Sequence, residues 1–360
     1  MAVMPRDREQ LGRRDWYGPD PREPSRTERR LLAASGVASL ASRSLTRRRG
    51  RSSDARDAPT YRKVFVVGCG RSGTTWVQEC LSTPATVTTT QESHAYENIY
   101  DPIRRLGNSP IAWARIVHHY LMDRRRQRWA GLYWWVTRRQ LTDIAAAALA
   151  EGASSPEQTA QRAIHAVFDT WYSEHARPGQ VLLEKTPGHI AYAHLILEEF
   201  ADARIVEVMR DGRDVCVSLE KHAQTMHWPP TTRDAQIRMW KRCVEAGERL
   251  RLDPALGPRV FRVHYEDLRA RPHRELSRLF EALDIAVTPT EIAEIVDVHD
   301  MSRVARRSEG GHRRKGAVGD WRTELSAEDV ARFDELAGEL ARRVGYDDLG
   351  RVRASHGEVG

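Results

Sequence analysis

The residues best suited to bind a phosphate group lie in one glycine-rich stretch, Gly68-Cys-Gly-Arg-Ser-Gly-Thr-Thr-Trp76. The stretch follows a β-branched run, precedes a helical pattern and has the outline of a P-loop, G-x-x-x-x-G-[K]-[ST]. Its glycines let successive N–H groups turn toward an anion, and the helix N-terminus adds partial positive charge. Thr74 stands where nucleoside triphosphatases carry lysine, and Arg71 places a cation inside the loop instead. This departure predicts a shorter anionic ligand and argues against Mg²⁺-dependent ATP or GTP hydrolysis.

Two later stretches also combine basic, hydroxyl and glycine residues. Arg210 directly follows the apolar run 204–209, and Ser218 lies about two turns along the helix expected next. This spacing lets a guanidinium and a hydroxyl reach one phosphate. In the second stretch, H-R-R-K-G-A-V-G-D-W-R at 312–322, three basic residues precede two glycines, so the backbone can fold closely around an anion. An ion pair at a strand end and a solvated basic loop are the ordinary structural alternatives.

Short apolar runs alternate with helical patterns from Tyr61 onward. The runs predict strands, and the patterns between them predict helices; the strands are expected at 63–67, 87–90, 181–183, 204–209 and 260–263, and the helices near 74–81, 188–200, 210–221, 272–284 and 288–298. Such alternation predicts a three-layer α/β fold with a central parallel sheet. Ligands bind such sheets at the carboxyl ends of strands. The candidate residues follow strand ends, so we expect them to form one site.

Residues 103–176 interrupt this alternation with a mostly helical, aromatic-rich insertion. Either the insertion packs a small core of its own, or it caps the site of an acceptor substrate, or it does both. Residues 1–60 are basic and show little periodicity, which predicts a disordered tail. A folded domain is expected over 61–349, followed by a short C-terminal tail at 350–360.

The formal net charge of +7 is concentrated at the N-terminal end. Residues 1–60 contain 14 Arg and 8 acidic residues, so the remaining residues carry a net charge near +1, which argues against a nucleic-acid partner. Arginine outnumbers lysine 52 to 5, which is typical of GC-rich coding and makes arginine content weak support for phosphate binding. No apolar run approaches the ~20 residues of a membrane span. The four cysteines form no C-x-x-C pair, which favours reduced thiols in the cytoplasm over a zinc site or a disulfide framework.

Taken in order, these stretches resemble the sulfotransferases that use 3'-phosphoadenosine 5'-phosphosulfate (PAPS). Gly70–Trp76 resembles their 5'-phosphosulfate loop, and Arg210–Ser218 resembles their 3'-phosphate motif. Residues 314–322 are similar to the R-K-G-x-x-G-D-W segment of the cytosolic branch. Tyr265–Leu268 is similar to the Y-E-D-[LM] segment of the family, and Glu184–Pro187 to its E-K-[ST]-P segment. The matches occur in family order and cover about residues 61–345.

The resemblance implies a set of nucleotide-binding residues. The 5'-phosphate side would be bound by the loop, that is Gly70, Arg71, Ser72, Gly73, Thr74 and Thr75. The 3'-phosphate would be held by Arg210, Ser218, Arg314, Lys315 and Gly316. Trp76 would stack on the adenine and Tyr265 would lie near it; the structural alternative for each is a core residue. The resemblance further implies PAPS as donor, no metal and a hydroxyl acceptor, with a carbohydrate or a complex natural product favoured; it leaves the oligomeric state open.

Two cations are candidates for stabilising charge during sulfonate transfer. Arg71 stands where cytosolic members carry lysine; it can stabilise the bridging oxygen but cannot give up a proton. Lys185, at a strand end, is the more mobile cation beside the sulfonyl group. The alternative for Lys185 is a purely structural ion pair with Glu184 or another acid.

The general base is expected after the second strand, where other branches of the family carry glutamate. Glu92 stands there, and a carboxylate in a partly dry site can have a raised pKa that suits proton abstraction. His94 is the second candidate, His189 the third, and Glu97 a weaker one.

Two other functions compete with sulfonate transfer. A P-loop kinase would need the lysine that Thr74 replaces. A non-catalytic nucleotide-binding protein would have no use for Glu92 and Lys185. Neither alternative accounts for the R-K-G-x-x-G-D-W segment.

Overall fold

The computed structural model describes residues 61–126, 128, 130–150, 155–226, 228–300 and 317–347. They form two compact units. The first, here the P-loop unit, contains Val64–Pro84 and the described residues from Pro187 onward. The second, here the helical unit, contains the described residues up to Lys63 together with Ala85–Thr186. The tails expected at 1–60 and 350–360 lie outside the described residues, as do Arg314, Lys315 and Gly316.

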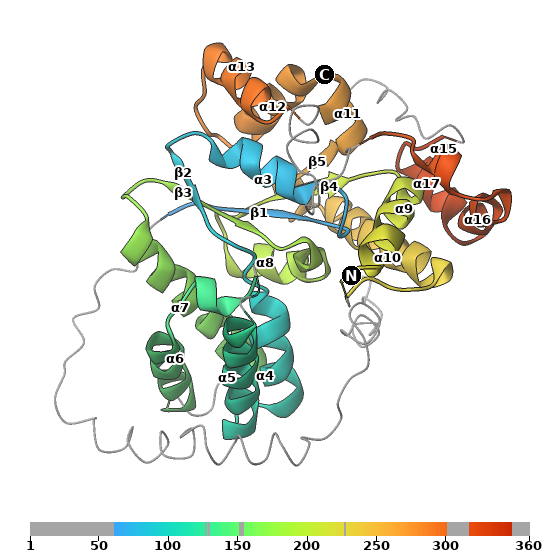
Figure 1. Ribbon diagram of the computed structural model, residues 1–360. Coiled ribbons are helices and arrows are strands. Elements are labelled where there is room, and N and C mark those ends of the chain that lie inside the picture. The colour runs from blue at the N-terminus through green and yellow to red at the C-terminus, as the bar shows by residue number, and fades with distance from the viewer. Residues whose placement is uncertain are drawn as a thin grey trace. The chain divides into compact units, whose positions relative to one another are not determined.

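Three parallel strands organise the P-loop unit. β4 (Arg204–Met209) lies between β1 (Lys63–Gly68) and β5 (Val260–His264), with Val66 opposite Val206 and Val206 opposite Phe261. β1 is buried along its whole length, as its continuous apolar run predicts for a strand covered on both faces. Helices α3 (Thr74–Ser82) and α12 (Pro272–Ala282) lie on one side of these strands, and α8 (Ala193–Glu199) and α10 (Arg233–Arg251) on the other (Figure 1).

The remaining helices of this unit follow in chain order. Their bounds are α9 Gly212–Ala223, α11 Tyr265–Ala270, α13 Pro289–Val298, α15 Trp321–Glu324, α16 Ala327–Phe333 and α17 Glu339–Arg343. Short 3-10 turns cover Pro187–Tyr192 and Gly257–Arg259, and a π-helical turn covers Asp334–Gly338.

In the helical unit, two strands and four helices pack around an aromatic core. β2 (Val87–Thr89) and β3 (Val181–Lys185) pair in parallel. The helices are α4 (Asp101–Leu106), α5 (Pro110–Arg125), α6 (Arg138–Ala150) and α7 (Pro156–His175), with a π-helical turn at Tyr96–Tyr100 and a 3-10 turn at Leu132–Trp134. The buried Trp135 ring lies 5.0 Å from the Phe168 ring and 5.3 Å from the Trp171 ring, between centroids. The insertion therefore packs a core of its own.

The structure confirms the expected α/β class, since the strand pairs within each unit are parallel. One expected helix, at 188–200, begins instead as the 3-10 turn Pro187–Tyr192 and becomes α-helical only at Ala193. None of the helices in the described ranges combines the length and apolarity needed to cross a bilayer.

Candidate active site

The glycine-rich loop joins β1 to α3 and turns tightly at two of its glycines. Gly68 and Gly73 have φ angles of 148° and 96°, where an L side chain is strained. A Cβ atom on Gly73 would lie 2.5 Å from the Tyr265 ring, so glycine is also required by the close approach of that ring. The N–H of Ser72 donates to the carbonyl of Cys69 at 3.1 Å and closes the turn. The sequence therefore produces the loop geometry that the P-loop pattern predicts.

Two buried polar atoms at this loop have no hydrogen-bond partner among the described residues. They are Oγ of Ser72 and Nε of Arg210. A buried donor or acceptor without a partner costs about 1–3 kcal/mol, so such atoms are rare in folded proteins. Their position beside the loop fits a site that binds an anion.

The loop and the Arg210–Ser218 stretch meet in space. Nε of Arg71 donates to Oγ of Ser218 at 3.2 Å, and Nη1 of Arg210 donates to the carbonyl of Arg71 at 3.2 Å. The Arg210 guanidinium also lies 4.7 Å from the centroid of the Tyr265 ring. Four predicted site residues from three strand ends are thus neighbours, as expected for the carboxyl edge of a parallel sheet.

Asp214, which was not among the predicted site residues, connects this cluster to the C-terminal stretch. Its carboxylate accepts the N–H of Gly319 at 2.7 Å and the N–H of Trp321 at 3.0 Å, and it lies 3.9 Å from Arg210. Nη2 of Arg210 in turn donates to the carbonyl of Ala317 at 2.8 Å. The only sequence signal is the acid four residues after Arg210, which stands in the first turn of α9 while Arg210 directly follows β4.

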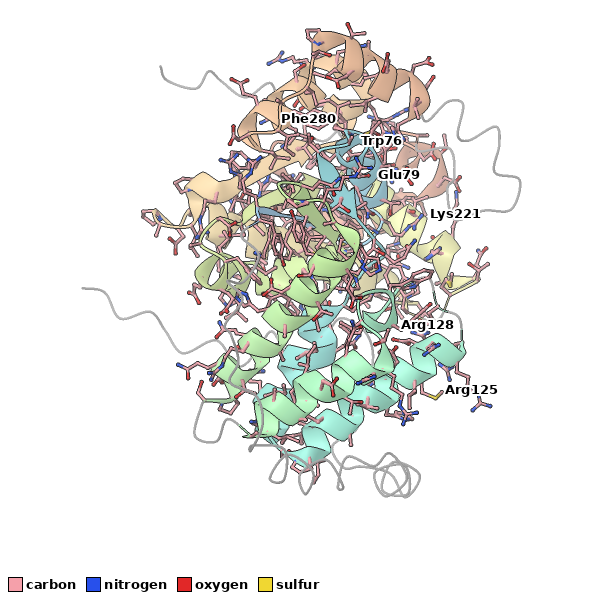
Figure 2. The ribbon with its side chains drawn as sticks, turned by 90° about the vertical axis from the view of Figure 1, so that its left-hand side faces the viewer. Trp76, Glu79, Arg125, Arg128, Lys221 and Phe280 are labelled. Carbon is pink, nitrogen blue, oxygen red and sulfur yellow. The ribbon has the colours of Figure 1, made fainter. Side chains whose placement is uncertain are left out.

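Trp76 is both a core residue and a neighbour of Tyr265. Its ring is 8% exposed and meets the Tyr265 ring edge to face, at 5.6 Å between centroids. Nε1 of Trp76 donates to the carbonyl of His299 at 2.9 Å. Trp76 lies on α3 together with Glu79, and both can be found in Figure 2 near Phe280 of the neighbouring helix α12. The role of Trp76 beside the adenine stays a prediction.

A second cluster lies at the carboxyl ends of β2 and β3 in the helical unit. Nζ of Lys185 forms a buried ion pair with Oε1 of Glu92. The other oxygen, Oε2 of Glu92, lies 3.2 Å from Nε2 of His94, whose Nδ1 lies 3.9 Å from Oε1 of Glu97. Cations and carboxylates therefore alternate in the order Lys185, Glu92, His94, Glu97. All but His94 are buried.

The raised pKa expected for Glu92 is wrong for this structure. Burial alone would raise the pKa of Glu92. The charge of Lys185 and the hydrogen bond from His94 outweigh burial and lower that pKa. The expected rise followed from burial alone, without the charge of Lys185 and the hydrogen bond from His94. Glu92 is therefore ionised at neutral pH, and its basicity depends on how closely Lys185 holds it.

His94 is a cation in this cluster and a poor proton acceptor. His94 is only half-buried, and its partial removal from water opposes the charged form; hydrogen bonds and charges from Glu92 and Glu97 outweigh this effect and raise the pKa of His94 to about 10. Glu92 is consequently the better candidate for a base.

We expect the contribution of His94 to stability to depend on pH. A folded-state pKa raised to about 10 from 6.5 stabilises the folded protein fully below pH ~6.5, and this stabilisation is lost as the pH rises toward 10. Urea unfolding of wild type and His94→Gln should therefore give a difference in free energy of unfolding that is largest near pH 6 and shrinks by pH 10. A difference independent of pH would contradict the assignment of a charged His94.

Glu184 fixes the loop that carries Glu92 and His94. Its Oε1 accepts the N–H and the hydroxyl of Ser93, at 3.1 and 2.8 Å, and the hydroxyl of Thr186 at 2.6 Å. Oγ1 of Thr186 accepts the N–H of His94 at 3.3 Å. Glu184 and Thr186 therefore hold the loop of Glu92 and His94, and Lys185 between them forms the ion pair with Glu92. His189 lies in the P-loop unit, buried in the 3-10 turn at Pro187–Tyr192.

The protein thus has an α/β fold and a glycine-rich loop of P-loop outline, with Thr74 at the position where nucleoside triphosphatases carry lysine. A profile of the family described as "Sulfotransferase family" matches residues 63–289, more than half of the chain. The chain belongs to that family, and the resemblance noted from its motifs is confirmed.

Individual relatives are distant. "Cytosolic sulfotransferase 4" of Arabidopsis thaliana is 24% identical over 159 residues, covering 42% of this chain and 54% of the relative. "Sulfotransferase 6B1" of Danio rerio is 30% identical over 103 residues, covering 25% of this chain and 35% of the relative. The chain thus spans about half, or less, of the curated relatives it matches.

Similar solved structures carry sulfotransferase names as well. Sulfotransferase STF9 from Mycobacterium avium has a TM-score of 0.49 and 15% identity, covering 91% of this chain and 88% of its own. Mouse sulfotransferase SULT7A1, solved in complex with PAP, has a TM-score of 0.48 and 16% identity, covering 89% of this chain and 93% of its own. The family assignment rests on the profile match.

Proposed function

We propose that this protein transfers a sulfonate group from PAPS to an acceptor hydroxyl, with a carbohydrate or a complex natural product as the favoured acceptor. The observation that carries the proposal is the meeting of Arg71, Ser218 and Arg210 around a loop without the triphosphatase lysine. Two cationic groups and a hydroxyl beside a ring of N–H donors suit a nucleotide with separate 5' and 3' phosphates.

The P-loop unit supplies the nucleotide contacts in this proposal. Backbone N–H groups and hydroxyls from Ser72 to Thr75 bind the 5'-phosphosulfate, and Arg71 stabilises the bridging oxygen. Arg210 and Ser218 hold the 3'-phosphate. Arg314, Lys315 and Gly316 are assigned to the same phosphate from the resemblance.

The helical unit supplies the acid–base chemistry. The acceptor oxygen forms a new bond to sulfur as the bond from sulfur to the 5'-phosphate oxygen breaks, and Glu92 takes the proton of the acceptor hydroxyl. Lys185 stabilises the negative charge that develops during transfer. Any anion that draws Lys185 away from Glu92 also raises the proton affinity of that carboxylate, because the lysine charge is what lowers its pKa. The ion pair therefore keeps the base ionised and weak until substrate is bound.

The proposal involves no metal ion and places the protein in the cytoplasm. All four cysteines are buried free thiols, which suits a reducing compartment. Burial raises the pKa of the Cys80 thiol to about 12, so this thiol is not an activated nucleophile.

Adenosine 3',5'-bisphosphate (PAP) should raise the melting temperature far more than AMP does. The reason is that Arg210 and Ser218 are assigned to the 3'-phosphate, which AMP lacks. A ligand that binds only the folded state stabilises it by about 2.7 kcal/mol at a hundredfold excess over Kd. Thermal unfolding with each nucleotide measures the shift of the melting temperature, and equal shifts would reject the 3'-phosphate assignment.

Nucleotide binding also separates the two alternative functions. Strong stabilisation by ATP with Mg²⁺ alone would favour a kinase, and tight PAP binding without any transfer would favour a non-catalytic protein.

Asp214→Ala should weaken PAP binding by roughly tenfold or more and leave AMP binding almost unchanged. Hydrogen bonds to a charged group contribute about 1.5–3 kcal/mol each, and this change removes two that hold the C-terminal stretch beside Arg210. Calorimetric titration with both nucleotides gives the ratio of affinities. Asp329→Ala, which removes an acid of α16, is the control and should keep the wild-type ratio. Equal losses for PAP and AMP would show that Asp214 supports the whole fold and not the 3'-phosphate site.

A further inference from the structure

The helical unit carries a strongly basic surface beside exposed aromatic side chains, and the nucleotide contacts do not use it. Residues 124–142 contain six arginines and no acidic residue, a net charge of +6, whereas the whole of residues 85–186 has 12 basic and 10 acidic residues, a net charge of +2. All six arginines are exposed; they are Arg124, Arg125, Arg126, Arg128, Arg138 and Arg139. Figure 2 shows Arg125 and Arg128 at the outer end of α5 and just beyond it. Positive charge is therefore segregated onto one part of this unit.

The two arginine runs are neighbours in space. The buried hydroxyl of Tyr120 lies beside both: burial raises its pKa, and the charge of Arg124 and a hydrogen bond with the backbone of Arg138 oppose that shift. Helices α5 and α6 also pack on each other. The two arginine runs therefore lie close together in the helical unit.

The dipole of α5 accounts for only part of this surface. Arg124 and Arg125 lie in the last turn of α5, where a cation is stabilised by the helix dipole. Arg138 and Arg139 lie at the start of α6, where a cation is disfavoured, and the first turn of α6 contains no acid to offset them. Two carboxylates flank the six arginines: Asp123 lies 3.5 Å from Arg128, and Asp143 lies 4.0 Å from Arg139. They leave most of the positive charge of the surface unbalanced. A bound anion would relieve this arrangement.

An aromatic turn connects the basic surface to the candidate base. Trp134 is 43% exposed, and its ring centroid lies 5.3 Å from that of the half-buried Tyr133. The turn begins at Gly131, whose N–H donates to the carbonyl of Glu92 at 2.7 Å. The N–H of Trp134 donates to the carbonyl of Gly131 at 3.2 Å, which keeps their Cα atoms within about 7 Å. The exposed indole is thus held close to the loop of Glu92.

We propose that this surface binds the acceptor and that the acceptor is an anionic saccharide, whose carboxylate or sulfate groups pair with the arginines and whose ring packs on Trp134. The inference rests on the proposed function, because it assigns the acceptor of that reaction. Among hydroxyl-bearing molecules, an acidic sugar offers an apolar ring face, anionic groups and a free hydroxyl together. Guanidinium groups match carboxylate and sulfate geometry with paired hydrogen bonds.

Binding of tetragalacturonate and of the neutral maltotetraose to the full chain tests this inference. Calorimetry in the presence of PAP should show binding of tetragalacturonate that weakens with added salt and little binding of maltotetraose. Arg125→Gln combined with Arg138→Gln should lower the affinity for tetragalacturonate about five- to tenfold, since two exposed ion pairs contribute up to about 1 kcal/mol each. Trp134→Ala should also weaken binding, and Trp134→Phe should restore most of it.

Arg249→Gln combined with Arg274→Gln is the matched control, because it removes two exposed arginines of the P-loop unit. This control should bind tetragalacturonate as wild type does, and every variant should bind PAP normally. Equal binding of the two saccharides, no binding of tetragalacturonate, or an equal loss in the control would overturn the inference. So would tight binding of single-stranded DNA without binding of tetragalacturonate. If the wild-type protein does not bind PAP at all, the proposed function itself is rejected.

Discussion

Replacing Glu92 with glutamine is expected to lower kcat by roughly 10²–10⁴ while the affinity for PAP stays near that of wild type. Glutamine keeps the shape of glutamate and most of its hydrogen bonds but cannot accept a proton. The nucleotide contacts that we propose belong to the P-loop unit, and Glu92 belongs to the helical unit, so binding and turnover should separate. Steady-state kinetics with labelled PAPS and a responsive acceptor, together with PAP titration, measure both quantities.

Three further variants make the assignment of the base specific. Glu157→Gln removes an exposed acid of α7 and should leave kcat unchanged. Glu97→Gln should have a much smaller effect than Glu92→Gln, because Glu97 lies on the far side of His94 from Lys185. Full turnover by Glu92→Gln, with loss of turnover in His94→Gln or His189→Gln, would show that the base is a histidine.

The fold was largely predictable because its signals are local. Continuous β-branched runs predicted β1 and β4 with bounds within one residue of those observed, and glycines at 68 and 73 predicted the loop between β1 and α3. The region from Pro187 was less predictable, because proline and glycine at its start favour a tight 3-10 turn over regular α-helix. Sequence periodicity does not carry this distinction.

The members of the candidate site were easier to predict than their electrostatics. Motif order placed Arg71, Arg210 and Ser218 in one cluster, and the structure brings them together. The pKa of Glu92 was predicted in the wrong direction, because the shift depends on Lys185, which is 93 residues away in the chain. Such a pairing follows from the parallel register of β2 and β3, which composition and spacing do not reveal.

The supporting residues were the least predictable part. Asp214 and Glu184 accept hydrogen bonds from backbone N–H groups. Nearly every residue type has a backbone N–H, so the residue type at the donating position does not indicate such a bond. The acids were visible in the motifs, but what they hold became visible only in three dimensions. The same is true of the basic surface, whose two arginine runs are separated by an aromatic turn.

Lys185→Ala is expected to lower kcat by roughly 10²–10³, since it removes a positive charge placed to stabilise the transferring group. It should also move the acidic limb of the profile of kcat/KM against pH to higher pH. Without the lysine, burial raises the pKa of Glu92 and only His94 opposes it, so the carboxylate becomes protonated at a higher pH. Two further variants test whether the charge of Lys185 sets the pH profile. Lys185→Arg keeps the charge and should preserve the pH profile more than the rate, because guanidinium and ammonium differ in shape.

Lys63→Ala, which removes another buried lysine of the helical unit, is the matched control and should leave the pH profile in place. Urea unfolding and PAP titration of each variant establish that it is folded. A Lys185→Ala enzyme with reduced kcat but an unmoved acidic limb would mean that Glu92 does not titrate in the rate-limiting step, and the lysine would then act on the sulfonate alone.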